Sequence, residues 1–416
     1  MRILFLTPQL PYPPNKGTSL RNFNIIKNLA CRHEIHLLTF CASVQELSNA
    51  QPLNKYCARI EVVTPPKRTS AQRLSSIAFS PLPDMALRLA SNKLTAKLEQ
   101  SVLSTSYDLI QVEGIELMPA VMTLLDKQKR ARLPKVVFDD HNAEYVLQQR
   151  AYEVDWERLR RWPWAFYSYV QCRRLRRYER NACRRTSATI AVSEEDREAL
   201  LGLDSGLDVA VVPNGVDTEY FRGPLLCADS QAEKPCAPPN LVFTGTMDFR
   251  PNIDAMTWFC KSIFPQIIQR VPDVHLYIVG KNPTSRVREL AGPSVTVTGE
   301  VEDVRPYLAK AAVYVVPMRY GGGVRLKVLE AMAYGVPIVS TRFGAEGVMV
   351  RDGENILLAQ ATRDGEEFAR KVLELLDRPA LGRNLVTQAR LLAEQRYDWK
   401  SIVPRLEELY LRLNPQ

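Results

Sequence analysis

The chain has 416 residues, of which 46% are hydrophobic and 24% charged, and its formal net charge is +9. These are the proportions of an ordinary globular protein, and the length predicts two domains of about 200 residues each. No apolar run approaches the ~18 residues of a membrane-spanning helix. Four histidines and eight scattered cysteines argue against a zinc site. We therefore expect a cytoplasmic protein that needs neither a metal ion nor another cofactor.

Short aliphatic runs alternate with helical stretches along the chain, which is typical of parallel sheets wrapped by helices. Both halves show this pattern, so the sequence predicts two Rossmann-like α/β domains. In the first half the expected strands are Arg2–Thr7, Ile35–Phe40, Ile60–Val63, Leu109–Val112, Val136–Phe138, Thr189–Val192 and Val209–Val212. In the second half they are Leu241–Thr244, His275–Val279, Ser294–Thr298, Val313–Val316, Pro337–Ser340 and Ile356–Leu358.

Composition also predicts the domain boundaries. The connection 223–239 holds four prolines and no apolar periodicity, so we expect it to be a linker. It separates a first domain, 1–222, from a second domain, 240–396. Residues 397–413 include an amphipathic run and are expected to form a terminal helix.

The first strand leads into a proline-rich loop that ends near Gly17. The prolines stiffen the loop, Gly17 permits close approach to the backbone, and Thr18 or Ser19 could cap the following helix. A loop at the carboxyl end of a parallel strand can meet a phosphate group. A plain turn has the same composition and remains an alternative.

A polar cluster, Asp139 to Glu144, ends another strand. A histidine at the end of a strand, here His141, is expected to face a ligand rather than the core, and imidazole is suited to hydrogen bonding near neutral pH. The alternative is a helix cap by Asp140 or Asn142 with His141 as a bystander, which the spacing alone slightly favours. The two adjacent aspartates do not have the spacing of a metal-binding Asp-x-Asp.

Most of the net charge lies between Arg150 and Arg185, a segment that contains 11 arginines and only four acidic residues. The same segment holds aromatic residues: Trp156, Trp162, Trp164, Phe166, Tyr167, Tyr169 and Tyr178. Arginine and tryptophan on one helix are typical of membrane-surface binding, and we favour contact of 150–185 with the inner face of the cell membrane. Two alternatives stay open: a helix packed on the first domain with buried aromatic rings, and stacking on single-stranded nucleic acid.

The first strand of the second domain is followed by a turn and then Arg250, whose planar guanidinium could reach phosphate oxygens. Residues 321–335 read Gly-Gly-Gly-Val-Arg-Leu-Lys-Val-Leu-Glu-Ala-Met-Ala-Tyr-Gly. Glycines at a helix start expose backbone N–H groups to an anion. At about 100° per residue, Lys327, Glu330 and Tyr334 share one arc of the expected helix, with apolar residues opposite. This suits a nucleoside diphosphate, with Lys327 on phosphate and Glu330 on the ribose; a surface Lys–Glu pair is the alternative.

These segments resemble the family 4 retaining glycosyltransferases. Residues 321–335 are similar to that family's donor-site motif, in the variant Gly-Gly-Gly-x-Arg-Leu-Lys-x-Leu-Glu-Ala-Met. The common motif has two glutamates; Glu330 matches the second, and Gly322 stands where the first would be. The resemblance implies the GT-B architecture, with two facing Rossmann-like domains, a cleft between them and a terminal helix that returns to the first domain.

The resemblance also implies roles for individual residues. Glu330 would hold the ribose of a nucleotide-sugar donor, His141 would orient the sugar, and the backbone at Glu300 and Val301 would contact the base. Phosphate charge would be met without a metal. The residues expected at the donor diphosphate are Gly17, Arg250, Gly322, Gly323, Arg325 and Lys327.

The expected function is a metal-independent, retaining glycosyl transfer of the hexosyltransferase type. The donor would be a nucleotide sugar, and the acceptor a glycan or a lipid-linked molecule in cell-surface polysaccharide or glycolipid synthesis; no nucleic-acid partner is expected. One rival is a sugar-nucleotide 2-epimerase of the same shape, which would need more acid–base groups than one histidine. Another is a nucleotide-binding regulatory protein, which would keep Glu330 without needing His141.

Overall fold

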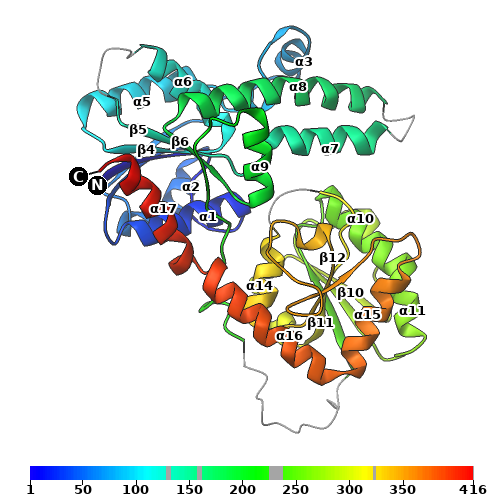
Figure 1. Ribbon diagram of the computed structural model, residues 1–416. Coiled ribbons are helices and arrows are strands. Elements are labelled where there is room, and N and C mark those ends of the chain that lie inside the picture. Colours follow the sequence, from blue (N-terminus) through cyan, green and yellow to red (C-terminus); the bar gives the residue numbers. More distant parts are fainter. Residues whose placement is uncertain (128–132, 157–161, 224–237, 322–324, 416) are drawn as a thin grey trace. The chain divides into compact units, whose positions relative to one another are not determined.

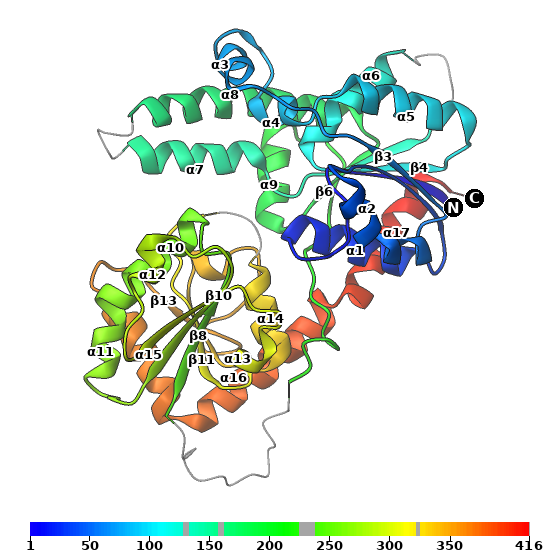
Figure 2. The ribbon, with the colours of Figure 1, turned by 180° about the vertical axis from the view of Figure 1, so that it is seen from behind.

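The computed structural model describes residues 1–127, 133–156, 162–223, 238–321 and 325–415 (Figures 1 and 2). These residues form two compact units: unit 1 comprises Met1–Pro213 and Ile402–Gln416, and unit 2 comprises Asn214–Ser401. Each unit has its own apolar core. Most of the predicted linker, residues 224–237, lies outside the described residues. Within the described part of the chain, no helix combines the length and apolarity needed to cross a bilayer.

Unit 1 is built on a seven-stranded parallel sheet with the order β3-β2-β1-β4-β5-β6-β7. Its inner strands are almost continuously apolar because helices cover both faces of the sheet. The order reverses between β1 and β4, and loops at the carboxyl ends of strands diverge at such a point. The strands are β1 (Arg2–Thr7), β2 (Glu34–Phe40), β3 (Arg59–Val63), β4 (Leu109–Glu113), β5 (Lys135–Asp139), β6 (Ala188–Ala191) and β7 (Val209–Val211).

The helices of unit 1 lie on both faces of this sheet. Figures 1 and 2 show α5 (Asn92–Ser104) and α6 (Met118–Lys127) on one face, with α1 (Gly17–Leu29) and α17 (Trp399–Leu413) on the other. The remaining helices are α2 (Val44–Asn49), η1 (Gln51–Lys55), α3 (Ser70–Phe79), α4 (Asp84–Arg88), η2 (Ile115–Leu117), α7 (Glu144–Trp156), α8 (Trp162–Arg185) and α9 (Glu194–Leu203).

Helices α7 and α8 run side by side as a hairpin that extends beyond the sheet (Figures 1 and 2). The base of the hairpin is tied to unit 1, because Arg174 donates hydrogen bonds to the carbonyls of Ser76 and Ile77 at 3.3 and 2.9 Å. The buried face of α8 includes Leu175 and Tyr178. Residues 157–161, between the two helices, lie outside the described residues.

Unit 2 contains a six-stranded parallel sheet with the order β10-β9-β8-β11-β12-β13. Here the order reverses between β8 and β11, so the loops after these two strands are the expected place for a ligand. The strands are β8 (Asn240–Thr244), β9 (His275–Val279), β10 (Val295–Gly299), β11 (Ala311–Val316), β12 (Ile338–Thr341) and β13 (Leu357–Ala359).

Helices also cover both faces of the second sheet. In Figures 1 and 2, α14 (Leu326–Tyr334) and α16 (Pro379–Leu392) lie on one face, and α11 (Phe264–Ile268) and α15 (Glu366–Asp377) lie on the other. The remaining helices are α10 (Arg250–Trp258), η4 (Phe259–Ile263), α12 (Ser285–Arg288), α13 (Arg305–Leu308), η5 (Phe343–Ala345) and η6 (Ala393–Tyr397).

The predicted fold class is confirmed: two parallel α/β sheets are present, and every predicted strand matches an observed strand to within two residues at each end. Residues 214–222 follow β7 and already belong to unit 2. The N–H of Val216 donates to the carbonyl of Tyr397 at 2.8 Å, and Thr218 N donates to an Asp398 carboxylate oxygen at 3.2 Å.

Candidate functional site

Helix α14 has the two faces that the sequence predicts. Lys327, Glu330 and Tyr334 are half-buried on one face, whereas the opposite face is buried in the core of unit 2. The helix ends at Gly335, whose φ of 91° is in the left-handed region that favours glycine. The amphipathic helix and its glycine cap are therefore confirmed.

The start of the helix differs from the expectation. The structure begins α14 at Leu326, with Arg325 as the preceding cap residue, so the glycines do not open the described helix. Gly322 and Gly323 lie outside the described residues. Arg325 is buried and donates through Nε to the carbonyl of Phe343 at 3.2 Å. A Cβ atom added at Gly321 would lie 2.9 Å from Arg325 Nη2, so this guanidinium lies against the backbone of residue 321.

Lys327 reaches from α14 to the loop that follows β8. Its Nζ donates to Asn252 Oδ1 at 3.1 Å and lies 3.9 Å from the centroid of the Phe243 ring. A Cβ atom at Gly245 would lie 2.7 Å from Nζ, so the ammonium group lies against this backbone. Burial, and then repulsion by Arg325, lower the pKa of Lys327 to about 7, although Glu330 acts in the opposite direction.

Glu330 lies one turn further along the same face. Burial raises the pKa of its carboxyl group to about 7, and the charge of Lys327 offsets only part of that effect. An exposed Lys–Glu pair would be solvated and would not show these shifts. The surface-pair alternative is therefore a poor description of Lys327 and Glu330, which form a desolvated cation and carboxylate at the carboxyl edge of the sheet.

The other residues predicted in unit 2 lie at the same edge of the sheet. Arg250 begins α10, is exposed, and lies 5.9 Å from the centroid of the Tyr320 ring, next to Gly321. Glu300 is exposed and Val301 is half-buried, directly after β10. The structure therefore brings Arg250, Arg325, Lys327 and Glu330 to the loops and helix that follow β8 and β11.

In unit 1, His141 follows β5 and makes one buried contact. Its Nε2 forms a 3.0 Å hydrogen bond with a carboxylate oxygen of Glu113, the last residue of β4, and the Glu113 side chain is fully buried. Burial disfavours the charged ring, but the hydrogen bond to Glu113 and the charges of Asp139 and Glu113 outweigh it. The pKa of His141 is therefore raised above its ordinary value.

Asp139 lies next to this pair and is held by Arg21 from α1. The guanidinium donates to Asp139 Oδ2 at 3.0 Å from Nε and 2.6 Å from Nη2. Possible ligand atoms of Glu113, Asp139 and His141 lie within 4.8 Å of one another, close enough for a metal ion. A cation there would be repelled by the buried Arg21. In addition, His141 Nε2 is already hydrogen-bonded to Glu113. These residues therefore fit an organic hydrogen-bonding site better than a metal site.

Asp140 points to a different partner. It is buried beside Glu179 of α8, and burial followed by the charge of Glu179 raises the pKa of Asp140 well above its usual range. The Glu179 carboxylate accepts hydrogen bonds from the N–H groups of Glu144 and Tyr145 at 2.7 and 3.2 Å, at the start of α7. Glu179 thus caps α7 from a distance of 34 residues in sequence.

Gly17 is exposed and is the first residue of α1, and the cap position is occupied by Lys16 rather than by Thr18 or Ser19. Ser19 lies inside the first turn, where its hydroxyl accepts from Lys16 N at 3.1 Å and donates to Lys16 O at 3.0 Å. The remaining N–H groups of this helix start are available to an anion.

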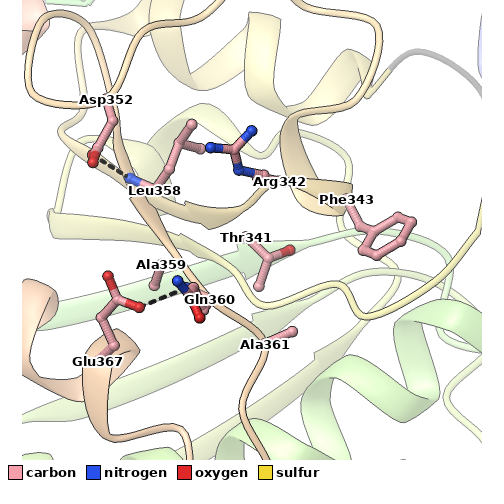
Figure 3. A pocket seen from close by; sticks show the side chains of 9 residues that line it. All are labelled: Thr341, Arg342, Phe343, Asp352, Leu358, Ala359, Gln360, Ala361 and Glu367. Atoms are coloured by element: carbon pink, nitrogen blue, oxygen red, sulfur yellow. Dashed lines mark hydrogen bonds between the residues drawn. The ribbon is translucent and has the colours of Figure 1, made fainter.

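A separate cavity of about 410 Å³ lies at the carboxyl ends of β12 and β13 (Figure 3). Its acidic lining residues, Asp352 and Glu367, accept hydrogen bonds from the backbone N–H groups of Leu358 and Gln360 at 2.7 and 2.9 Å. None of the site residues that the sequence predicts is among the residues that line this cavity. Phe343 lines it and also accepts the hydrogen bond from Arg325, so the two regions are neighbours.

The sequence analysis missed Glu113, Arg21, Asn252 and Glu179. Glu113 carried a usable signal, since a charged residue that ends an apolar central strand faces the ligand-binding edge of a parallel sheet. Arg21 and Glu179 lie within ordinary helical patterns. Their partners are 118 and 35 residues away, and the residues around Arg21 and Glu179 in the sequence do not indicate which distant residues they bind.

Two family models match successive parts of the chain. The model described as Glycosyltransferase Family 4 matches residues 17–220, and the model described as Glycosyl transferases group 1 matches residues 238–378. Among curated proteins, the phosphatidyl-myo-inositol mannosyltransferase of Mycobacterium tuberculosis is 28% identical over 219 residues, which is 49% of this chain and 54% of that protein. The chain spans about half the length of the curated relatives it matches.

Solved structures show the same fold over almost the whole chain. Sucrose-phosphate synthase from Thermosynechococcus elongatus superimposes with a TM-score of 0.70 at 19% identity, covering 99% of each chain. Anabaena HepE, solved in complex with UDP-glucose, has a TM-score of 0.65 at 18% identity and covers 98% of this chain and 99% of its own. With two glycosyltransferase models matching its two halves and these structures sharing its fold, the chain belongs to the glycosyltransferases of GT-B architecture.

Proposed function

We propose that the chain transfers a sugar from a nucleotide-sugar donor to a glycan or lipid-linked acceptor of a cell-surface glycan, with retention of anomeric configuration. The observation that carries this proposal is the group of Arg325, Lys327 and Glu330 at the start of α14, where Lys327 lies against the glycine turn after β8 and Arg325 lies against Gly321. Both cations are largely removed from solvent before any ligand is present, so a diphosphate would gain strong interactions there.

Each group has a defined task in this proposal. Arg325, Lys327 and Arg250 stabilise the negative charge that develops on the leaving nucleoside diphosphate, in place of a metal ion. Glu330 accepts hydrogen bonds from ribose hydroxyls. The backbone near Glu300 and Val301 contacts the base, and the backbone at Gly17 contacts the diphosphate.

His141 is the residue that we assign to the donor sugar. The direction of its pKa shift favours the protonated form of the ring, which can donate a hydrogen bond to a sugar oxygen. The two-glutamate motif would be met in a variant form, with Glu330 as its second glutamate and Gly322 in place of the first. A 2-epimerase would need further acid–base groups around the sugar, and a purely regulatory protein would not need His141.

Thermal unfolding with a panel of nucleoside diphosphates tests the nucleotide site. A ligand at 100 times its Kd stabilises by about 2.7 kcal/mol, so one base should raise the Tm of the wild type clearly. Glu330→Ala should abolish that rise, while the exposed control Glu289→Ala should keep it. If no nucleotide raises the Tm, or if Glu330→Ala responds like the wild type, the nucleotide assignment is wrong.

Product analysis separates transfer from the two alternatives. Wild type incubated with a nucleotide sugar and an acceptor should release the nucleoside diphosphate and form a glycoside of unchanged anomeric configuration. His141→Ala should bind the nucleotide normally and turn over at least tenfold more slowly. An epimerised sugar without glycoside, or equal turnover in both proteins, would contradict the transfer mechanism.

We also propose that the α7–α8 hairpin docks on an anionic membrane surface. The alternative of a packed helix with buried aromatic rings describes Tyr178, which is 6% exposed, but not Trp164 or Phe166, which are 66% and 68% exposed. Trp162 and Trp156 are also exposed, and their rings stack with centroids 5.4 Å apart. Indole rings at such a tip suit the headgroup level of a bilayer.

Exposed residues form one stripe along α8. Trp162, Phe166 and Tyr169 start it, and arginines continue it on the same face at helical spacing: Arg173, Arg176, Arg177, Arg180 and Arg184. In the described part of the chain, no carboxylate forms an ion pair with the three middle arginines, 176, 177 and 180. Lipid phosphates would supply the missing negative charge.

Co-sedimentation with vesicles tests this surface. The protein should bind vesicles of phosphatidylcholine with phosphatidylglycerol, more weakly at high salt, and should not bind phosphatidylcholine alone. Trp162→Ser with Phe166→Ser should reduce binding at least tenfold, whereas Leu103→Ser, an exposed apolar residue of α5, should not. Equal binding of both variants, or binding only to single-stranded RNA, would overturn the membrane assignment.

A further inference from the structure

A chain of buried hydrogen bonds connects the C-terminal helix to His141. Tyr410 of α17 donates through its hydroxyl to Gln111 Oε1 at 3.0 Å. Gln111 Nε2 donates to Glu113 Oε1 at 2.9 Å, and the other oxygen of Glu113 bonds to His141 Nε2 at 3.0 Å. Tyr410, Gln111 and Glu113 are all fully buried. An acidic side chain is rarely placed so deep without a specific partner.

The chemistry of these groups fixes the direction of each bond. The Gln111 amide has one oxygen, which only accepts, and one nitrogen, which only donates. Tyr410 must therefore donate to the oxygen, and the nitrogen then points to Glu113. A carboxylate oxygen accepts, so the hydrogen bond to Glu113 places a hydrogen on His141 Nε2. The nitrogen that can face a ligand is then Nδ1, for which no bond to another described residue is found.

The hydrogen bond to the ring distinguishes Glu113 from the other acidic groups near His141. Asp139 is the other carboxylate beside the ring, and its charge also raises the pKa of His141, but its hydrogen bonds come from Arg21. Glu144 of α7 also acts on this region, although burial raises the pKa of its carboxyl group to about 8 and keeps it mostly neutral. Glu116 is ion-paired with Arg88 at 2.6 Å. Within the described residues, the one ion pair that Glu113 makes is with His141.

We propose that Glu113, held by Gln111 and Tyr410, is a positioning residue that fixes a hydrogen on His141 Nε2 and leaves Nδ1 to act on the donor sugar. This inference rests on the proposed role of His141 in sugar transfer. Glu113 acts through the ring and does not itself contact the sugar. The C-terminal helix thereby controls the state of a residue that follows β5.

Imidazole NMR of protein labelled in its four histidines tests the proposal without any substrate. In the wild type, His141 should show a hydrogen on Nε2 and a pKa above its ordinary value. In Glu113→Gln this pKa should fall by about one pH unit, because the carboxylate charge is lost while its shape is kept. Tyr410→Phe should lower the pKa of His141 by a smaller amount. It keeps the proposal testable if the buried Glu113→Gln variant fails to fold.

Tyr178→Phe is the matched control. Tyr178 is a buried tyrosine of the same unit, and its hydroxyl has no hydrogen-bond partner among the described residues. Its removal should leave the His141 signals unchanged. If Glu113→Gln and Tyr410→Phe also leave them unchanged, or if Tyr178→Phe shifts them equally, the positioning role is refuted.

Kinetics then link this role to the reaction. With UDP-glucose or GDP-mannose as the donor, Glu113→Gln should lower kcat at least tenfold, leave the donor KM near the wild-type value and shift the pH profile to lower pH. An unchanged kcat together with a shifted His141 pKa would overturn the functional part of the inference. Absence of turnover in the wild type, with the NMR result intact, would refute the proposed transfer reaction rather than the coupling of Glu113 to His141.

Discussion

Lys327 shows how its surroundings alter the chemistry of one side chain. Its Nζ contacts the Phe243 ring and one amide oxygen, and burial lowers its pKa to about 7. The free protein at pH 8 would then hold mostly neutral Lys327. A bound diphosphate would favour the ammonium form, so binding above pH 7 should take up a proton.

This uptake predicts a pH-dependent affinity. The diphosphate of a nucleotide sugar does not titrate near pH 7, so a change in affinity would report on the protein. Between pH 7 and the higher pKa of the complex, Kd should rise by up to about tenfold per pH unit. Lys327→Arg, which stays charged, should remove this rise. Calorimetric titrations at pH 7, 8 and 9 would measure it, and an equal slope in both proteins would contradict the assignment.

At the scale of the element, two glycines on helices have opposite roles. Gly335 ends α14 with φ at 91°, where a Cβ atom is strained. Gly202 lies within α9 with φ in the ordinary range and no atom within 4 Å of an added Cβ. The first glycine is required by backbone conformation, whereas the second only weakens its helix.

Alanine substitutions should separate the two cases. Gly335→Ala should destabilise the protein by about 1–2 kcal/mol, because alanine disfavours the left-handed conformation. Gly202→Ala should stabilise by up to about 1 kcal/mol. Urea unfolding of the two variants beside wild type measures both, and a stabilised Gly335→Ala would show that another residue ends the helix.

Much of the element structure could be predicted from the chain because the signals are local. Aliphatic runs such as Val136–Phe138 mark buried parallel strands, and α14 carries both its apolar face and its terminal glycine in consecutive residues. The cap of α7 could not be predicted, because its acceptor, Glu179, is supplied by another helix. Likewise, the periodicity of α8 cannot tell which aromatic residues are covered: Tyr178 is buried and Phe166 is exposed.

At the scale of the whole molecule, unit 1 contains buried carboxyl groups that stay protonated at a higher pH than they would in the unfolded chain. Burial, as the largest cause, raises the pKa of Asp139 to about 6, of Glu179 to about 7 and of Glu144 to about 8. In the unfolded chain these groups ionise near pH 4. Below the pKa of each group in the folded protein, these three carboxyl groups therefore bind more protons than they do in the unfolded chain.

Stability should consequently fall as the pH rises from 5 to 7, the range below the point at which Lys327 acts in the opposite direction. A group with a raised folded pKa contributes stability fully at low pH and loses it as the pH passes that pKa, by up to about 1.4 kcal/mol per proton and pH unit. Glu179→Gln keeps an acceptor for the start of α7 but cannot ionise, so its slope should be shallower. Urea unfolding at four pH values would show this, and parallel slopes would refute the contribution of Glu179.

The sequence by itself determined the two parallel α/β units, the amphipathic α14 with Lys327 and Glu330 on one face, and the position of His141 after a buried strand. These features depend on periodicity and on residues near one another in the chain, so local physical chemistry is sufficient to predict them. Only the tertiary structure decided that Arg21 pairs with Asp139, that Asn252 accepts a hydrogen bond from Lys327, and that hydrogen bonds link Tyr410 to Glu113 through Gln111. Apart from Gln111 and Glu113, which are two positions apart, those contacts join residues 75 to 299 positions apart, and local sequence patterns do not reveal such pairs.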